Sequence, residues 1–111
     1  MVIFVGFVAM ALAQNVDMFA QYWDIAALVV ILHNTIAVLS GLGLGFLAKL
    51  PITQRRSISI ETGIQNSGLG LVISFTFFPE VDELALVCAM WGVWHIISGF
   101  AWAFLLRRIK V

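Results

Sequence analysis

Residues 55–73 read RRSISIETGIQNSGLGLVI, and this stretch decides the fold of the chain. It opens an apolar run that continues to Phe78, whose length of about twenty residues is enough to cross a bilayer core of ~30 Å as a helix. A plain membrane helix would lack polar groups and glycines in its middle, because the first are costly in hydrocarbon and the second loosen the helix. Here both cluster, as Glu61, Gln65 and Asn66 and as Gly63, Gly68 and Gly70. The combination predicts a discontinuous helix that lines a site.

Composition assigns the chain to the integral membrane proteins. Of its 111 residues, 62% are hydrophobic and 11% are charged, a composition outside the range of soluble proteins. The formal net charge is zero. The charge balance offers no basic patch for nucleic acid. The single cysteine, Cys88, rules out a disulfide within the chain and a cysteine metal cluster. No catalytic triad, zinc spacing or phosphate loop is present, so we expect no enzyme.

Four hydrophobic segments predict an all-α, polytopic membrane helix bundle that forms a single membrane domain. The segments are about residues 1–16, 25–50, 57–78 and 84–106, the third being the discontinuous helix. The first ends in Ala11-Leu12-Ala13, which is similar to a signal-peptide cleavage site, but no Lys or Arg occurs before Lys49. We therefore expect a membrane helix whose beginning lies outside the chain. The polar residues between 15 and 24 predict a connection at the membrane interface.

Charge predicts the orientation of these segments. Lys and Arg lie in the loop at 49–56 and in the tail after residue 106, whereas five of the six acidic residues lie at 17–24 and 80–83. Loops rich in Lys and Arg stay on the cytoplasmic side. We therefore expect both termini in the cytoplasm and the acidic turns outside, with the chain in a bacterial inner membrane.

The second segment contains two glycines at a spacing typical of helix packing. Gly41 and Gly45 form a small-xxx-small pair, which permits close approach of another backbone. Ordinary glycine enrichment of membrane helices is the alternative interpretation.

The motif at 61–68 reads Glu-Thr-Gly-Ile-Gln-Asn-Ser-Gly and is preceded by the basic pair Arg55 and Arg56. Together they resemble the signature of the bile acid:sodium symporter family. Leu32-His33-Asn34 and residues 94–99, WHIISG, extend the resemblance over most of residues 25–106. It implies a transporter fold of two inverted repeats of five helices, of which this chain would hold the last four. The first repeat would be a missing partner, and the chain would be a truncated gene product or a fragment encoded on its own.

The resemblance also implies a sodium site. Sodium is a hard cation that takes oxygen ligands. By the family pattern Glu61 helps to bind two sodium ions as coupling ions, and Gln65 and the carbonyls of Thr62 and Ile64 assist at one of them. No other cofactor is expected.

Three residues are candidates for contact with an organic anion. The resemblance implies that Asn66 faces the anion. Asn34 and His95 either line the cavity or make hydrogen bonds between helices. The chain has Ile96 where many relatives carry Asn, which affects the polarity of the cavity wall. A half-helix resuming near Ser67 would add its N-terminal N–H groups as compensation for the negative charge.

Two functions are consistent with these observations. The first is the C-terminal part of a sodium-coupled symporter of organic anions such as bile acids or related carboxylates. The second is a truncated, non-transporting membrane helix bundle with a structural or interaction role.

Overall fold

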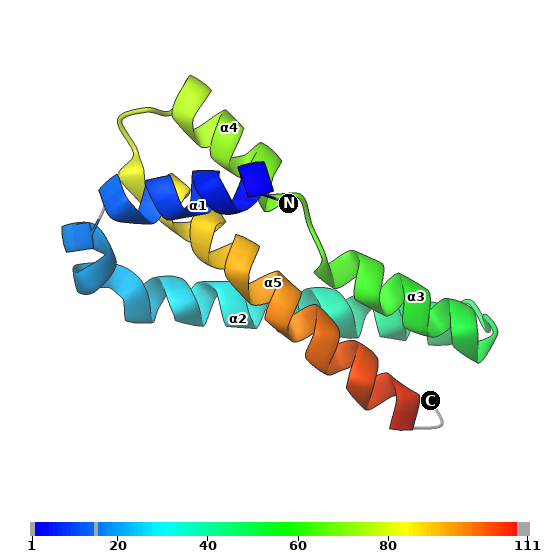
Figure 1. Cartoon of the computed structure of the whole chain (residues 1–111). Coiled ribbons are helices and arrows are strands. Elements are labelled where there is room, and N and C mark those ends of the chain that lie inside the picture. Colours follow the sequence, from blue (N-terminus) through cyan, green and yellow to red (C-terminus); the bar gives the residue numbers. More distant parts are fainter. Residues whose placement is uncertain (1, 15, 109–111) are drawn as a thin grey trace. The chain divides into compact units, whose positions relative to one another are not determined.

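The computed structural model describes residues 2–14 and 16–108, and the helices account for nearly all of them (Figure 1). In chain order they are α1 (Val2–Gln14), α2 (Val16–Leu47), α3 (Ile52–Gly63), α4 (Ser67–Phe77) and α5 (Asp82–Arg108), with no strand among the described residues. The all-α prediction is confirmed, and the four predicted segments fit these helices if α3 and α4 both belong to the third. That α3 and α4 form one discontinuous membrane crossing stays a prediction.

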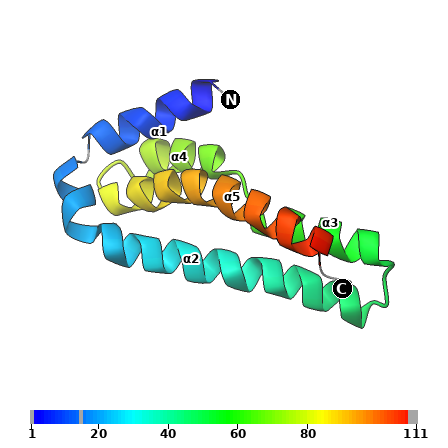
Figure 2. The ribbon, with the colours of Figure 1, turned by 60° about the horizontal axis from the view of Figure 1, so that its bottom comes forward.

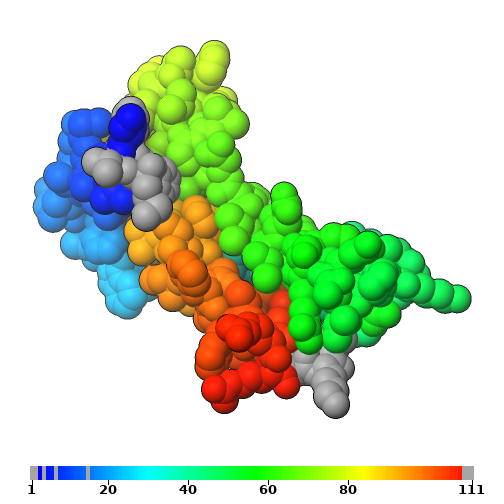
Figure 3. Space-filling model, turned by 45° about the vertical axis from the view of Figure 1, so that its right-hand side comes forward, coloured from blue at the N-terminus to red at the C-terminus, as the bar shows by residue number. Residues whose placement is uncertain are grey.

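Two helices, α2 and α5, are long and apolar enough to cross a membrane. Large apolar side chains stand exposed along the described helices, with Leu47 81%, Phe100 77% and Phe77 71% accessible. Figure 3 shows the end of α5 in red in the space-filling view. Apolar surface of this kind is suited to lipid or to further helices rather than to water.

The described residues form two compact units. Unit 1 holds the chain up to Val30 together with Asn66–Val93, and unit 2 holds Ile31–Gln65 together with the chain from Trp94. Helices α2 and α5 contribute residues to both units.

Unit 1 packs α1 and α4 against the first turns of α5 (Figures 1 and 2). Its core consists of small and aliphatic side chains, namely Val8, Ala11, Leu71, Ala85 and Ala89. A Cβ added to Gly70 would lie 2.9 Å from the sulfur of Cys88, so the glycine allows α4 to approach α5 closely.

Unit 2 is built on a helical hairpin of the second half of α2 and α3, which lie side by side in Figures 1 and 2. A Cβ on Gly41 would lie 2.9 Å from Ile58 O, and one on Gly45 would lie 3.1 Å from Arg55 Cα. The prediction that this glycine pair permits close approach is therefore confirmed. Because glycine has no Cβ, the two backbones pack more closely here than other residues would allow.

The turn of this hairpin is held by Arg55. Its Nε donates to Leu50 O at 2.6 Å, and its guanidinium lies over the ring of Phe46, 4.3 Å from the centroid. Lys49, with φ 53°, ends α2 in the left-handed conformation that often closes helices.

Two predicted connections are shorter in the structure than the sequence indicated. Residues 17–24 were expected in a polar connection but are helical, because α2 begins at Val16. Nothing between them breaks a helix, and Asp17 in the first turn suits the positive end of the helix dipole. Helix α3 likewise begins at Ile52, directly after Pro51, rather than at 57. Met1, Asn15 and Lys110, which fall in the predicted first segment, the first connection and the basic tail, lie outside the described residues.

Candidate functional site

The four predicted ion ligands lie at the end of α3. Glu61 and Thr62 belong to its last turn, Ile64 is the C-cap residue with φ −98° and ψ 105°, and Gln65 follows in non-helical backbone. The last four carbonyls of an α-helix have no partner within the helix. The end of α3 is therefore where the predicted site would find free backbone oxygens.

Two of those four carbonyls are taken by other groups. Ile60 O accepts the N–H of Ile64 at 3.0 Å, and Gly63 O accepts the side-chain amide of Asn34 at 2.8 Å. For Glu61 O and Thr62 O, the described part of the chain supplies no donor. The Thr62 carbonyl is therefore available, while its hydroxyl donates to Ile58 O within α3.

The Glu61 carboxylate is exposed within unit 2. It lines an open hollow of about 410 Å³ together with Ser57, Ile60 and Ile64. Gln65 and Ile64 are exposed as well. The described residues contain no group of three or more His, Cys, Asp and Glu that come together to hold a metal, so a cation here would depend on one carboxylate together with amide and carbonyl oxygens. Such a donor set fits a hard cation such as sodium.

Asn34 is buried between helices of unit 2, with 3% of its surface accessible. Its Nδ2 donates to Gly63 O, so the helix–helix hydrogen bond considered from the sequence is present. Asn34 also lines a cavity, and the two interpretations therefore hold together rather than excluding each other.

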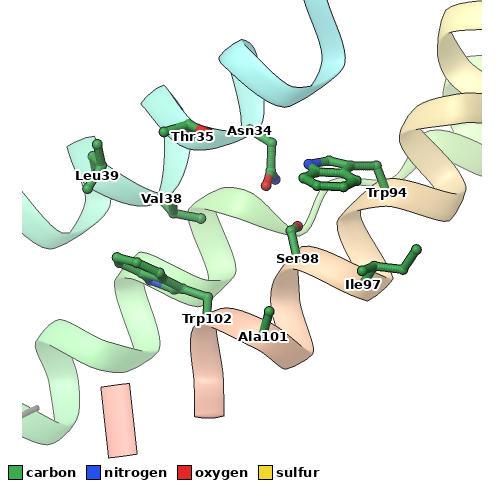
Figure 4. Close-up of a pocket in the computed structure, with 9 residues that line it drawn as sticks. All are labelled: Asn34, Thr35, Val38, Leu39, Trp94, Ile97, Ser98, Ala101 and Trp102. Atoms are coloured by element: carbon green, nitrogen blue, oxygen red, sulfur yellow. The ribbon is translucent and has the colours of Figure 1, made fainter. Parts of the chain in front are cut away.

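That cavity has a volume of about 230 Å³ and lies between α2 and α5 (Figure 4). Its walls are mostly apolar, and an amide, two hydroxyls and two indoles are its polar groups. The lining residues are Asn34, Thr35, Val38 and Leu39 from α2, and Trp94, Ile97, Ser98, Ala101 and Trp102 from α5. The indole Nε1 of Trp94 is buried without a hydrogen-bond partner in the described structure.

Asn66, predicted to face the anion, belongs to unit 1. Its Oδ1 accepts the N–H of Leu69 at 3.0 Å, and its carbonyl accepts the N–H of Gly70 at 3.2 Å. It is thus the N-cap of α4. The side chain is exposed, and the cap leaves its NH₂ group available.

His95, the remaining candidate, is buried in unit 2 with 8% of its surface accessible. Its carbonyl accepts the hydroxyl of Ser98 at 3.3 Å. His95 is not among the residues that line the cavity, whereas its neighbour Trp94 is.

Sequence reasoning missed Ser59 and the role of Trp102. The fully buried hydroxyl of Ser59 donates to Val38 O at 2.7 Å and accepts the indole N–H of Trp102 at 2.7 Å. One sequence feature could have indicated this contact: Ser59 and Gly63 are small residues four positions apart, so they share a face of α3 that another helix can approach closely.

Two curated relatives are similar to this chain. It is 41% identical over 71 residues to the uncharacterized sodium-dependent transporter YocS of Bacillus subtilis (strain 168), across 64% of this chain and 22% of that protein. It is 35% identical over 83 residues to the probable sodium/metabolite cotransporter BASS1, chloroplastic, of Arabidopsis thaliana, across 71% of this chain and 20% of that protein. The chain thus spans about a fifth of the length of these relatives. No family model and no solved structure matches it.

Proposed function

We propose, from the premise that the chain belongs to the bile acid:sodium symporter family, that it is the C-terminal part of a sodium-coupled symporter of organic anions. Both relatives are named for sodium dependence or sodium cotransport, and the chain is a membrane protein of the same kind. The observation that carries the proposal is the end of α3, where a carboxylate, an amide and available carbonyls follow one another within five residues.

Sodium binding is assigned to Glu61, Thr62, Ile64 and Gln65. The Glu61 carboxylate supplies the negative charge that balances the ion, and Gln65 and the carbonyls of Thr62 and Ile64 supply neutral oxygens. These four groups are about one or two short of the five or six oxygens that a hard cation of this size takes. The remaining ligands come from the first repeat of the transporter, which is the partner of this chain in the proposal.

The substrate is proposed to be a bile acid or a related carboxylate. Two features of unit 2 support an amphipathic anion: the apolar walls of its cavity and the unpartnered indole N–H of Trp94. In unit 1, taken by itself, the N-terminus of α4 is a place where negative charge is favourable. Helix N-termini stabilise negative charge. Asn66 and His95 remain proposed substrate contacts.

The proposed location is the bacterial inner membrane with both termini in the cytoplasm. Arg55 at the α2–α3 turn and Arg107 and Arg108 at the end of α5 mark the cytoplasmic side, because Lys and Arg are retained there. The turn before Asp82 lies on the outer side.

The proposal is tested in a chimera in which this chain replaces the matching part of Bacillus subtilis YocS. Glu61→Gln keeps the size of the side chain and removes its charge, so the sodium concentration for half-maximal uptake should rise more than ten-fold, equivalent to over ~1.4 kcal/mol. Gly43→Ala is the control, because a Cβ there meets no atom within 4 Å. Unchanged sodium dependence in Glu61→Gln and Gln65→Ala would show that the ligand assignment is wrong.

A further inference from the structure

We infer that Asn34 is a positioning residue for the sodium site: its side-chain amide fixes the peptide plane between the two carbonyls that bind the ion. The inference rests on the proposed function. It gives the residue a different role from the substrate contact expected from the sequence. Asn34 lies on α2, whereas all four proposed ligands lie on or just after α3.

The geometry of the Gly63–Ile64 peptide carries the inference. A peptide unit is planar, so its C=O and N–H move together. Here Gly63 O accepts from Asn34 Nδ2 at 2.8 Å, and Ile64 N donates to Ile60 O at 3.0 Å. The plane is thus held at both ends, from α2 on one side and from α3 on the other.

This plane separates the two proposed ligand carbonyls. The Thr62 carbonyl belongs to the preceding peptide unit and the Ile64 carbonyl to the following one. Only the φ and ψ angles of Gly63 and Ile64 lie between the fixed plane and these two oxygens. Gly63 is the last residue of α3, so the helix itself orients the Thr62 carbonyl. The bond from Asn34 therefore bears mainly on the Ile64 carbonyl, which lies beyond the end of the helix.

Gly63 is also what lets Asn34 come close. A Cβ on Gly63 would overlap the side chain of Val38 and lie 3.5 Å from Asn34 Nδ2. One turn away, Ser59 Oγ donates to Val38 O at 2.7 Å. From the first bond to the second, the chain advances by four residues on α2, from Asn34 to Val38, and goes back by four on α3, from Gly63 to Ser59. This is the register expected of two antiparallel helices. The α2–α3 contact is therefore fixed in register at the level of the ion site.

The burial of Asn34 argues for positioning rather than substrate contact. Only 3% of the residue is accessible, and one of the two N–H groups of its amide is engaged by Gly63 O. Partners that orient ion ligands from a second layer commonly change metal affinity about 10- to 100-fold when removed. We expect the lower end of that range for one neutral hydrogen bond.

The test compares Asn34→Leu, which keeps the volume but removes the donor, with Ser40→Ala, which removes a hydroxyl that bonds only to Ala37 O within α2. In the YocS chimera, Asn34→Leu should raise the half-saturating sodium concentration about 10-fold. The half-saturating substrate concentration, measured at saturating sodium, should stay within about two-fold, and Ser40→Ala should change neither. A general structural defect would instead lower the maximal rate at unchanged sodium affinity.

A second measurement examines the bond in the 111-residue chain itself. With ¹³C=¹⁸O at Gly63, the isotope-shifted amide I band of the chain in lipid should move to higher frequency in Asn34→Leu and not in Ser40→Ala. An unmoved band, or unchanged sodium affinity in the chimera, would overturn the inference. If Glu61→Gln weakens sodium binding but Asn34→Leu does not, only the positioning role fails. If neither variant affects sodium, the ion site itself is wrong.

Discussion

The indole nitrogen of Trp102 donates to the hydroxyl of Ser59 at 2.7 Å, and the same hydroxyl donates to Val38 O at 2.7 Å. Three helices, α5, α3 and α2, are thereby joined through one fully buried oxygen. In the interior of a membrane protein no water can replace these hydrogen-bond partners, so breaking the bonds is costly. The two bonds therefore hold α3 in place against α2 and α5.

A double-mutant cycle should reveal this coupling. Ser59→Ala and Trp102→Phe each remove one partner, and we expect a coupling free energy of roughly 0.5–1.5 kcal/mol between them. The measurement is unfolding of the purified chain in mixed micelles. Strictly additive effects would show that the two side chains do not interact.

The glycines of α2 should differ in their tolerance of a methyl group. Gly41→Ala places a Cβ 3.0 Å from Ser59 Cα, whereas the Cβ of Gly43→Ala meets nothing within 4 Å. Gly41→Ala should lower the free energy of unfolding by about 1–3 kcal/mol through overpacking, while Gly43→Ala should leave it nearly unchanged. Equal thermal stabilities of the two variants would contradict the close packing of α2 and α3.

The distinction between these glycines shows what the sequence can and cannot predict. The four-residue spacing of Gly41 and Gly45 predicted close approach because one helix face recurs about every four residues. The start of α2 at Val16 was missed, because scattered polar residues without a helix breaker look the same in an interfacial helix and in a loop.

The polar groups at the site show a second limit. Glu61 and Gln65 are recognisable because polar residues are rare in apolar segments. The bond between Ser59 and Trp102 joins residues 43 positions apart, and no local pattern encodes it. Asn34 was identified as a candidate, but its acceptor, a backbone carbonyl, carries no signal in the sequence.

Substitutions of Asn66 should separate its capping role from a substrate contact. Asn66→Ala removes the acceptor for Leu69 N and should destabilise α4 by about 1 kcal/mol. Asn66→Asp keeps the cap but replaces the NH₂ donor with an acceptor. If Asn66 also contacts the anion, Asp should preserve thermal stability and weaken substrate affinity several-fold in the YocS chimera. Full substrate affinity in Asn66→Asp would remove this residue from the substrate site.

The orientation in the membrane can be tested by labelling. Single cysteines at Gln54 and Asp82, both exposed, should react with impermeant thiol reagents from the cytoplasmic and the outer side respectively, in a Cys88→Ala background. We expect this orientation because loops rich in Lys and Arg stay on the cytoplasmic side of the membrane. Reaction of both positions from one side would refute the proposed topology.

Direct binding of ²²Na⁺ to the purified chimera tests the central claim, that the end of α3 holds the coupling ion. The parent protein should bind sodium saturably, Gly43→Ala should match it, and Glu61→Gln should bind more than ten-fold more weakly because the charge that balances the ion is gone. Saturable binding of equal affinity and stoichiometry in Glu61→Gln would contradict the claim.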